Sequence, residues 1–154
     1  MENDSKSNNI YIRFFIRGND IDPDEISHIL GISPDYKYKR GDLHGKNNQM
    51  VRKRGLWSIA SSEKVVSPDL QLHIEWLLAL LEPLKRQLES IISTKDVYAE
   101  ITCIFNLFSI EWDSHLEPSI LDRIADLHIQ FGISIYCLDN LDNRLKNDNK
   151  FSEE

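Results

Sequence analysis

The chain contains few of the residues that mark a secreted or membrane protein. It has two cysteines in 154 residues, Cys103 and Cys137, and both lie in apolar stretches. A secreted disulfide framework would contain more cysteines, placed in loops, so we expect two buried free thiols. No apolar run approaches the ~20 residues that span a bilayer, and the first residues, MENDSKSNN, lack the apolar core of a signal peptide. These absences predict a cytoplasmic protein without a membrane partner.

Motifs of catalysis and of cofactor binding are also missing. The sequence has no G-x-S-x-G motif, no glycine-rich phosphate or dinucleotide pattern, and no pair of histidines or cysteines at zinc-ligand spacing. The local cluster Asp113, His115 and Glu117 is interpreted as a turn followed by a helix cap. We therefore predict no catalytic residues, no metal and no cofactor. These absences favour a protein that is not an enzyme, and an enzyme stays open as an alternative.

Charge is unevenly distributed along the chain. The formal net charge is -7, which disfavours general affinity for nucleic acid. Residues 36–54, here called the basic stretch, carry a charge of +6, and the rest of the chain therefore carries -13. The basic stretch has one acid, Asp42. Its cations are Lys37, Lys39, Arg40, Lys46, Arg52, Lys53 and Arg54. Gly41, Gly45 and two asparagines indicate turns, so we expect a long loop here.

The periodicity of apolar residues predicts four strands and three helices in the order β-α-β-α-β-α-β. Residues 10–17 alternate with period two, as in a strand that has one buried face. Further strands are expected at 55–60, 97–107 and 133–138, and helices at 22–30, 70–92 and 118–131. Pro83 should kink the second helix or split it in two, and Gly132 should end the third.

These elements predict an α+β fold. The one-sided alternation of the first and third strands favours a two-layer sandwich, in which helices pack on one face of a largely antiparallel or mixed sheet. Residues 10–138 are expected to form a single domain. Polar composition predicts a disordered N-terminus at residues 1–9 and a flexible tail at residues 139–154.

Several landmarks occur in a characteristic order. Gly18 follows the first strand, Asp22-Pro23-Asp24-Glu25-Ile26 opens a helix, and Leu30-Gly31-Ile32-Ser33-Pro34 ends it. Arg54-Gly55-Leu56-Trp57 and a long leucine-rich helix follow. Over residues 10–138 this order resembles a bacterial family of domains of unknown function, DUF4279. The resemblance implies a compact domain of the bacterial cytosol, with no established activity or catalytic residues.

The outward side of the first strand is the predicted binding surface. If Ile10 and its alternate neighbours face the core, Tyr11, Arg13 and Arg17 point outward, beside Tyr98 of the third strand. Aromatic rings interleaved with arginines can hold an anion or a base. The basic stretch would lie over this surface and contribute Lys37, Lys39, Arg40, Lys53 and Arg54, with Trp57 added if its register agrees. The alternative is that Arg13 pairs with Glu100 across strands while the aromatic residues pack under the loop.

Three classes of function remain open from the sequence. The leading hypothesis is a non-catalytic binding or interaction module for an acidic protein partner or a phosphate-bearing small molecule, of which an immunity-type protein that neutralises a toxin is one version. The second is a single-stranded nucleic-acid binder that uses the sheet as a stacking platform. The third is an enzyme that acts on a phosphorylated substrate.

Overall fold

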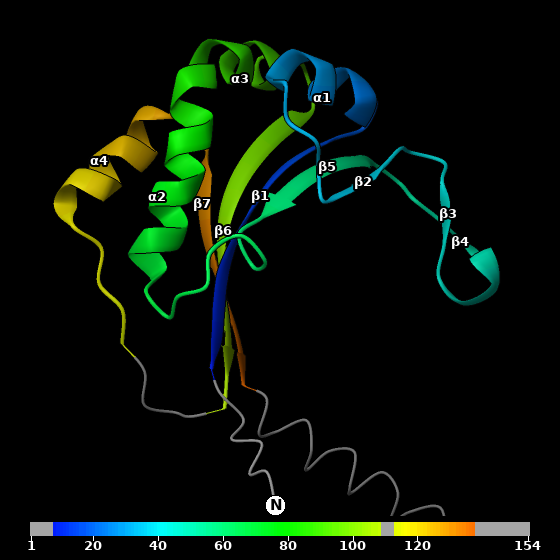
Figure 1. Ribbon diagram of the computed structural model, residues 1–154. Coiled ribbons are helices and arrows are strands. Elements are labelled where there is room, and N and C mark those ends of the chain that lie inside the picture. The colour runs from blue at the N-terminus through cyan, green and yellow to red at the C-terminus, as the bar shows by residue number, and fades with distance from the viewer. Residues whose placement is uncertain (1–7, 109–112, 138–154) are drawn as a thin grey trace, which may run out of the picture.

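The protein, described here from a computed structural model over residues 8–108 and 113–137, has an α+β fold (Figure 1). Its sheet has the strand order β2-β5-β1-β6-β7, antiparallel except for the parallel pair β6 and β7. A separate two-stranded sheet pairs β3 with β4. The strands are β1 (Asn9–Gly18), β2 (Tyr36–Tyr38), β3 (Leu43–His44), β4 (Met50–Val51), β5 (Gly55–Ala60), β6 (Val97–Leu107) and β7 (Gln130–Cys137).

The helices cover one face of this sheet, here called the covered face (Figure 1). They are α1 (Pro23–Leu30), α2 (Leu70–Leu81), the 3₁₀ turn Glu82–Leu84, α3 (Lys85–Ile92) and α4 (Pro118–Asp126). No helix of the described residues lies over the other side, here called the open face. The predicted α+β class, with helices on one face of a mixed sheet, is confirmed.

The central strand β1 shows why the two faces differ. Ile12, Phe14 and Ile16 are completely buried on the covered face, whereas the residues between them are at least partly exposed. Since successive side chains of a strand point to opposite faces, the period-two sequence pattern determines which face receives the helices.

Local capping sets the helix boundaries. The Asp22 carboxylate accepts a hydrogen bond of 2.9 Å from the backbone N–H of Asp24, and Gly31 ends α1 in the left-handed conformation at φ 66°. The long apolar segment divides into α2 and α3 at the 3₁₀ turn that contains Pro83, because proline lacks the N–H that would continue the helix. The split at Pro83 is one of the two predicted outcomes, and Leu77 of α2 and Leu88 of α3 lie in one core.

The basic stretch is more ordered than predicted. Instead of one long loop it contains β2, the β3–β4 hairpin and the 3₁₀ turn Lys46–Asn48, so the main sheet has five strands rather than the expected four. The hairpin projects away from the helical layer (Figure 1). A segment of three residues is too short to show the period-two pattern of a strand. β2 is a strand because it pairs with β5.

The third predicted helix is too long. α4 ends at Asp126, His128 adopts a positive φ of 55°, and Phe131 belongs to β7. The spacing of apolar residues around Phe131 fits either a helix or a strand. The left-handed conformation of His128 ends the helix, so the residues that follow form the strand. β7 therefore starts at Gln130, before the predicted Ile133.

Two buried-or-exposed assignments also differ from expectation. Trp57 lies opposite Ile16 in the β1–β5 register, so it faces the core and is fully buried, whereas it was predicted to join the outward surface. Its indole Nε1 donates a 2.9 Å hydrogen bond to Ser27 Oγ of α1. Cys103 is buried as predicted, but Cys137 is exposed, because it ends the outermost strand β7.

The predicted ends of the folded region shift slightly at the N-terminus. Asn9 begins β1, and Asn8 Oδ1 accepts a 2.8 Å hydrogen bond from the Phe108 backbone, so order begins before the predicted residue 10. The predicted disordered residues 1–7 and tail 139–154 lie outside the described residues.

Candidate functional site

The open face brings together most of the predicted binding residues of β1 and β6. Arg13 lies opposite Thr102, Phe15 opposite Glu100, and Arg17 opposite Tyr98. Together they line a solvent-open concavity of about 320 Å³ whose walls are Arg13, Phe15, Arg17, Tyr98, Glu100, Thr102, Ile104, Ser134 and Tyr136. Tyr11 shares this face one step further along β1, opposite Ile104. The period-two prediction for β1 and β6 therefore describes the face correctly.

Arg17 is the most unusual side chain in the concavity. Its guanidinium carbon lies 5.0 Å from the ring centre of Phe15 and 5.8 Å from that of Tyr98, and the two rings meet edge to face. The cation is held by the faces of aromatic rings. Its Nε atom is buried and has no hydrogen-bond partner among the described residues. A buried donor without an acceptor costs free energy, so a ligand oxygen that reached it would be bound favourably.

Arg13 is exposed beside this cluster and does not pair with Glu100. The Glu100 carboxylate instead accepts a 2.7 Å hydrogen bond from Thr102 Oγ1. It lies over Gly132 of β7, where an added Cβ would sit 2.5 Å from Glu100 Oε1. Glycine at this position thus leaves room for the carboxylate. The alternative of an Arg13–Glu100 pair is not found, and Arg13 forms no ion pair with any described residue.

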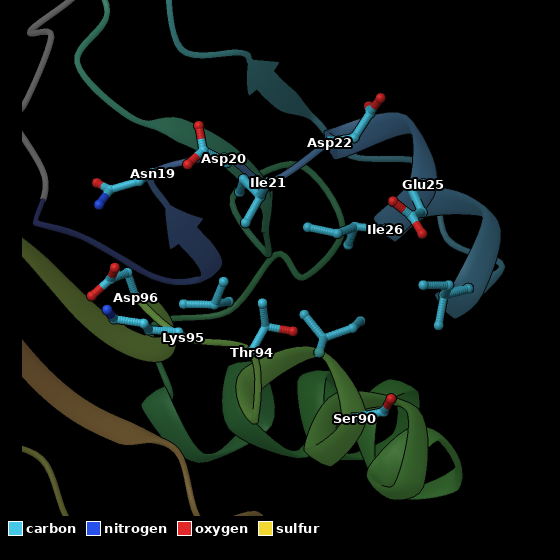
Figure 2. Close-up of a pocket in the computed structure, with 13 residues that line it drawn as sticks. Asn19, Asp20, Ile21, Asp22, Glu25, Ile26, Ser90, Thr94, Lys95 and Asp96 are labelled. Carbon is cyan, nitrogen blue, oxygen red and sulfur yellow. The ribbon is translucent and has the colours of Figure 1, made fainter.

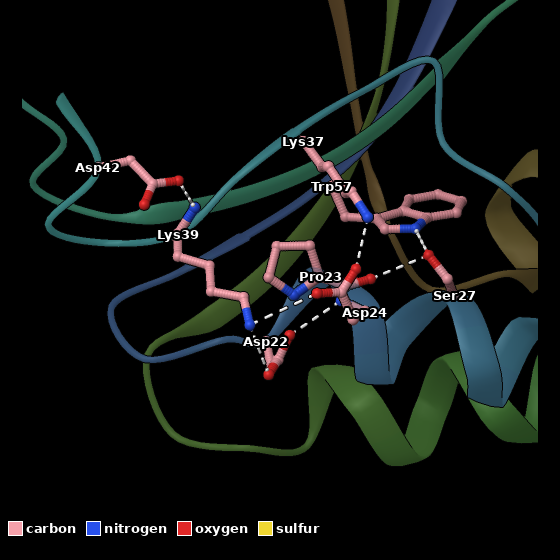
Figure 3. Close-up of polar contacts among 8 residues, drawn as sticks. All are labelled: Asp22, Pro23, Asp24, Ser27, Lys37, Lys39, Asp42 and Trp57. Carbon is pink, nitrogen blue, oxygen red and sulfur yellow. Dashed lines mark hydrogen bonds and ion pairs between the residues drawn. The ribbon is translucent and has the colours of Figure 1, made fainter. Parts of the chain in front are cut away.

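The basic stretch does not join this surface as predicted. Lys37 lies opposite Trp57, which places it at the covered face, and it pairs with Asp24 of α1 (Figure 3). Lys39 Nζ lies 2.9 Å from Asp22 Oδ2 and 3.5 Å from Asp24 Oδ2. Arg40 Nη1 lies 3.0 Å from Asp20 Oδ1. Three of the predicted binding cations are therefore already neutralised by the acids around the start of α1.

These pairs shift the titration of their carboxylates. The hydrogen bond from Lys39 lowers the pKa of Asp22 below its ordinary value, and the hydrogen bond from Lys37 does the same for the pKa of Asp24. The Asp22 contact correspondingly raises the pKa of Lys39. Asp22, Asp24 and Lys39 thus remain charged at neutral pH, and the pairs join the β2 region to α1 (Figure 3).

The remaining cations of the basic stretch have different surroundings. Lys53 and Arg54 are exposed in the turn before β5 and form no ion pair with described residues. Arg52 was not among the predicted site residues, yet its guanidinium stacks 4.1 Å from the Tyr38 ring centre and donates a 2.8 Å hydrogen bond to Tyr36 Oη.

Tyr36 and Tyr38 extend the aromatic surface of the open face onto β2. They lie opposite Ser58 and Leu56, which share the face of Phe15 and Arg17. The alternation of Tyr36-Lys37-Tyr38 could have predicted the position of these tyrosines, because in a strand the two tyrosines point to one face and the lysine to the other.

A second cavity of about 310 Å³ lies between α1, α3 and the ends of β1 and β6 (Figure 2). Ile21 and Ile26 lie among its lining residues, and Asp20, Glu25 and Asp96 give it acidic character. Within the described residues no three histidine, cysteine, aspartate or glutamate side chains are grouped to hold a metal ion. This cavity does not suit an anion and was not predicted from the sequence.

One serine–histidine contact resembles a catalytic pair in geometry only. Ser61 Oγ lies 2.6 Å from His73 Nδ1, and His73 Nε2 donates to the Ser67 carbonyl at 2.9 Å. Both side chains are buried, and Ser61 Oγ also accepts the Ile12 backbone N–H at 3.0 Å. A nucleophile closed off from substrate cannot react, so the pair is structural and connects β1 to α2.

Comparison with known proteins identifies a family but no activity. No curated protein and no solved structure matches the chain. Within the described residues no helix has both the length and the apolar character needed to cross a membrane. One family model matches residues 8–138, more than half of the chain, and it confirms the predicted resemblance. The chain therefore belongs to the DUF4279 family, a domain of unknown function.

Proposed function

We propose that the protein is a non-catalytic interaction module that binds an acidic segment of a partner protein on its open face. The observation that supports this most directly is the buried Nε of Arg17 between Phe15 and Tyr98, which no described residue pairs with. A carboxylate that approached the concavity would supply the missing acceptor and form a charge-assisted hydrogen bond.

The composition of the open face supports a protein partner over a small molecule. Tyrosine, phenylalanine and arginine are the residues enriched in protein interfaces and their hot spots. Here they extend from Tyr36, 52% exposed on β2, across β1 and β6 to Tyr136, 53% exposed on β7. Small-molecule sites are instead usually deep pockets that enclose the ligand.

Charge supports an acidic segment. Arg13, Arg17 and Arg52 face the same side of the sheet as Glu100, whose carboxylate is already bonded to Thr102. The surface is thus locally positive on a chain of net charge -7, which favours association with an acidic patch. The exposed thiol of Cys137 suits a reducing compartment such as the bacterial cytosol, where we place the protein.

The test is an NMR titration of the full chain with a glutamate-rich peptide, with inorganic phosphate and with single-stranded RNA in parallel. We expect the peptide to shift the amide signals of β1 and β6. The double variant Arg13→Met and Arg17→Met, which keeps the apolar stems, should abolish those shifts. The matched control, Lys53→Met with Arg54→Met, removes the same charge elsewhere and should leave them unchanged.

Other outcomes would contradict the proposal. Equal peptide shifts in the wild type and the Arg13/Arg17 variant would place the binding surface elsewhere. Binding of phosphate alone would identify a small-molecule site, and strongly salt-dependent RNA binding would favour the nucleic-acid alternative.

A further inference from the structure

The strand β7 forms one edge of the sheet. Its eight residues pair in parallel with β6 on one side, and no described strand pairs with the other side. Every second backbone N–H and C=O of an edge strand points away from the sheet, and such a row is a template for another strand. Natural proteins usually protect this kind of edge with charged residues, proline or a very short strand.

The opposite edge of the sheet has such protection, and β7 does not. The edge strand β2 has three residues and includes Lys37, and the chain leaves it directly for the β3–β4 hairpin. β7 reads QFGISIYC, which contains no lysine, arginine, aspartate, glutamate or proline. It is therefore the long, uncharged edge of this molecule.

The covered-face side chains of β7 are also exposed. Phe131, Ile133 and Ile135 are 38%, 62% and 60% exposed. Their partners in the adjacent strand, Ile101, Cys103 and Phe105, are 3% exposed or less. The apolar layer of the sheet thus continues onto β7, but the helices stop covering it there.

We propose that β7 pairs in antiparallel fashion with β7 of a second copy of this chain, so that the sheet continues through a two-fold axis. The composition of β7 suits this occupant. The net charge of -7 on each copy opposes self-association, but the repulsion is weakest at β7, because this strand contains no charged residue. A two-fold interface uses the same patch on both copies, and phenylalanine, isoleucine and tyrosine favour strand pairing.

The chain's own residues 138–154 suit this edge less well. Their sequence, LDNLDNRLKNDNKFSEE, is dominated by aspartate, asparagine, lysine and glutamate. These residues are depleted in strands, and they would set charges against Ile133 and Ile135.

The pairing has a definite geometry. When it is centred on Ser134, Ile133 lies opposite Ile135 of the second copy on the covered side. Both open faces then lie on the same side of one continuous sheet. A contact of one eight-residue strand, about 26 Å long, is small for a stable complex, so the expected dissociation constant is on the order of micromolar.

The experiment is sedimentation velocity of the full chain from about 1 µM to about 200 µM, a range that brackets a micromolar dissociation constant. We expect the wild type to shift from 18.0 kDa to about twice that mass as its concentration rises. Ile133→Lys and Ile135→Lys should each remain monomeric over this range, because they place a like charge at the pairing edge. Val66→Lys adds the same charge at a residue that is 99% exposed outside the strands, and it should dimerise as the wild type does.

Hydrogen exchange separates the possible occupants of the edge. In the proposed dimer the β7 amides become better protected as concentration rises, and the lysine variants lose that gain. A wild type that stays monomeric throughout would overturn the proposal, as would a dimer that both lysine variants retain. Protection of β7 that is independent of concentration would show instead that the chain covers its own edge.

Discussion

Phe14 and Phe15 are neighbours in β1, yet they have opposite surroundings. Phe14 is fully buried and meets Trp57 edge to face, with ring centres 6.2 Å apart. Phe15 is partly exposed and holds Arg17 against Tyr98. On the covered face aromatic rings fill the core, whereas on the open face the same residue type positions a cation.

Polar groups differ between the faces in the same way. On the covered side Ser61 bonds to both Ile12 and His73, so its buried polar atoms are satisfied. On the open side the Arg17 Nε lacks a partner within residues 8–108 and 113–137. The polar groups of the covered face thus contribute to stability. On the open face, a hydrogen-bond donor stays available for a ligand.

The two thiols give the sharpest test of this contrast. Burial raises the pKa of Cys103 to about 12, so only about one thiol in ten thousand is ionised at pH 8, whereas Cys137 is exposed. With a thiol reagent at pH 8 we expect one fast equivalent at Cys137 and a Cys103 reaction slower by roughly a thousandfold. Denaturant should make both react at once. Two fast equivalents in the folded protein would mean that the covered face opens readily.

A core truncation should separate the faces by stability. Leu77 of α2 is fully buried, and Leu77→Ala should lower the free energy of unfolding by about 2–5 kcal/mol. Leu72 of the same helix is 45% exposed, so Leu72→Ala is the matched control and should cost less than about 1 kcal/mol. Urea unfolding of both variants measures this difference. Equal losses would show that α2 does not form the core.

Removing one buried hydroxyl should have an intermediate effect. Ser61→Ala leaves the Ile12 N–H and His73 Nδ1 without their partner, and it should cost about 1–3 kcal/mol in urea unfolding. Ser93→Ala removes an exposed hydroxyl that donates only to the Ser90 carbonyl, so it should be close to neutral. A neutral Ser61→Ala would mean that this contact contributes no net stability.

The ion pairs between the basic stretch and α1 should have the smallest effect, and a pH-dependent one. Because the pKa values of Asp22 and Asp24 are lowered in the folded state, their contribution is fully present above the unfolded value near 3.8. It is lost as the pH falls through the folded-state values. The double variant Lys37→Ala and Lys39→Ala should thus unfold at slightly lower urea than the wild type at pH 7, and at the same urea at pH 2.

Lys46 provides the control for this experiment, since it forms no ion pair with described residues. Lys46→Ala should leave the midpoint unchanged at both pH values, and added salt should reduce the effect of the double variant at pH 7. A difference that persists at pH 2 would show that the lysine stems, not their charges, stabilise β2.

Long periodic segments could be predicted from the sequence, because their pattern is set by one buried face. The alternation of β1 and β6, the caps Asp22 and Gly31 and the break at Pro83 are of this kind. They were sufficient to predict the α+β class and to bring Arg13, Arg17 and Tyr98 together.

Features that depend on tertiary pairing could not be predicted in this way. Three-residue β2 exists because β5 pairs with it, and the face of Trp57 depends on the β1–β5 register. Lys37, Lys39 and Arg40 do not lie over the open face as predicted, because the fold brings the acids of residues 20–24 beside them and they form ion pairs there. Charge counted along a sequence does not reveal which charges are neutralised in space.

The ion pairs at α1 also determine where unpaired positive charge remains on the molecule. They neutralise the cations closest to the body, and Lys46, Lys53 and Arg54 remain unpaired among the described residues at and next to the projecting β3–β4 hairpin (Figure 1). Unpaired positive charge is thus gathered at the hairpin of a chain whose net charge is -7. These exposed charges are open to screening, so added salt should weaken the attraction of anions to the hairpin.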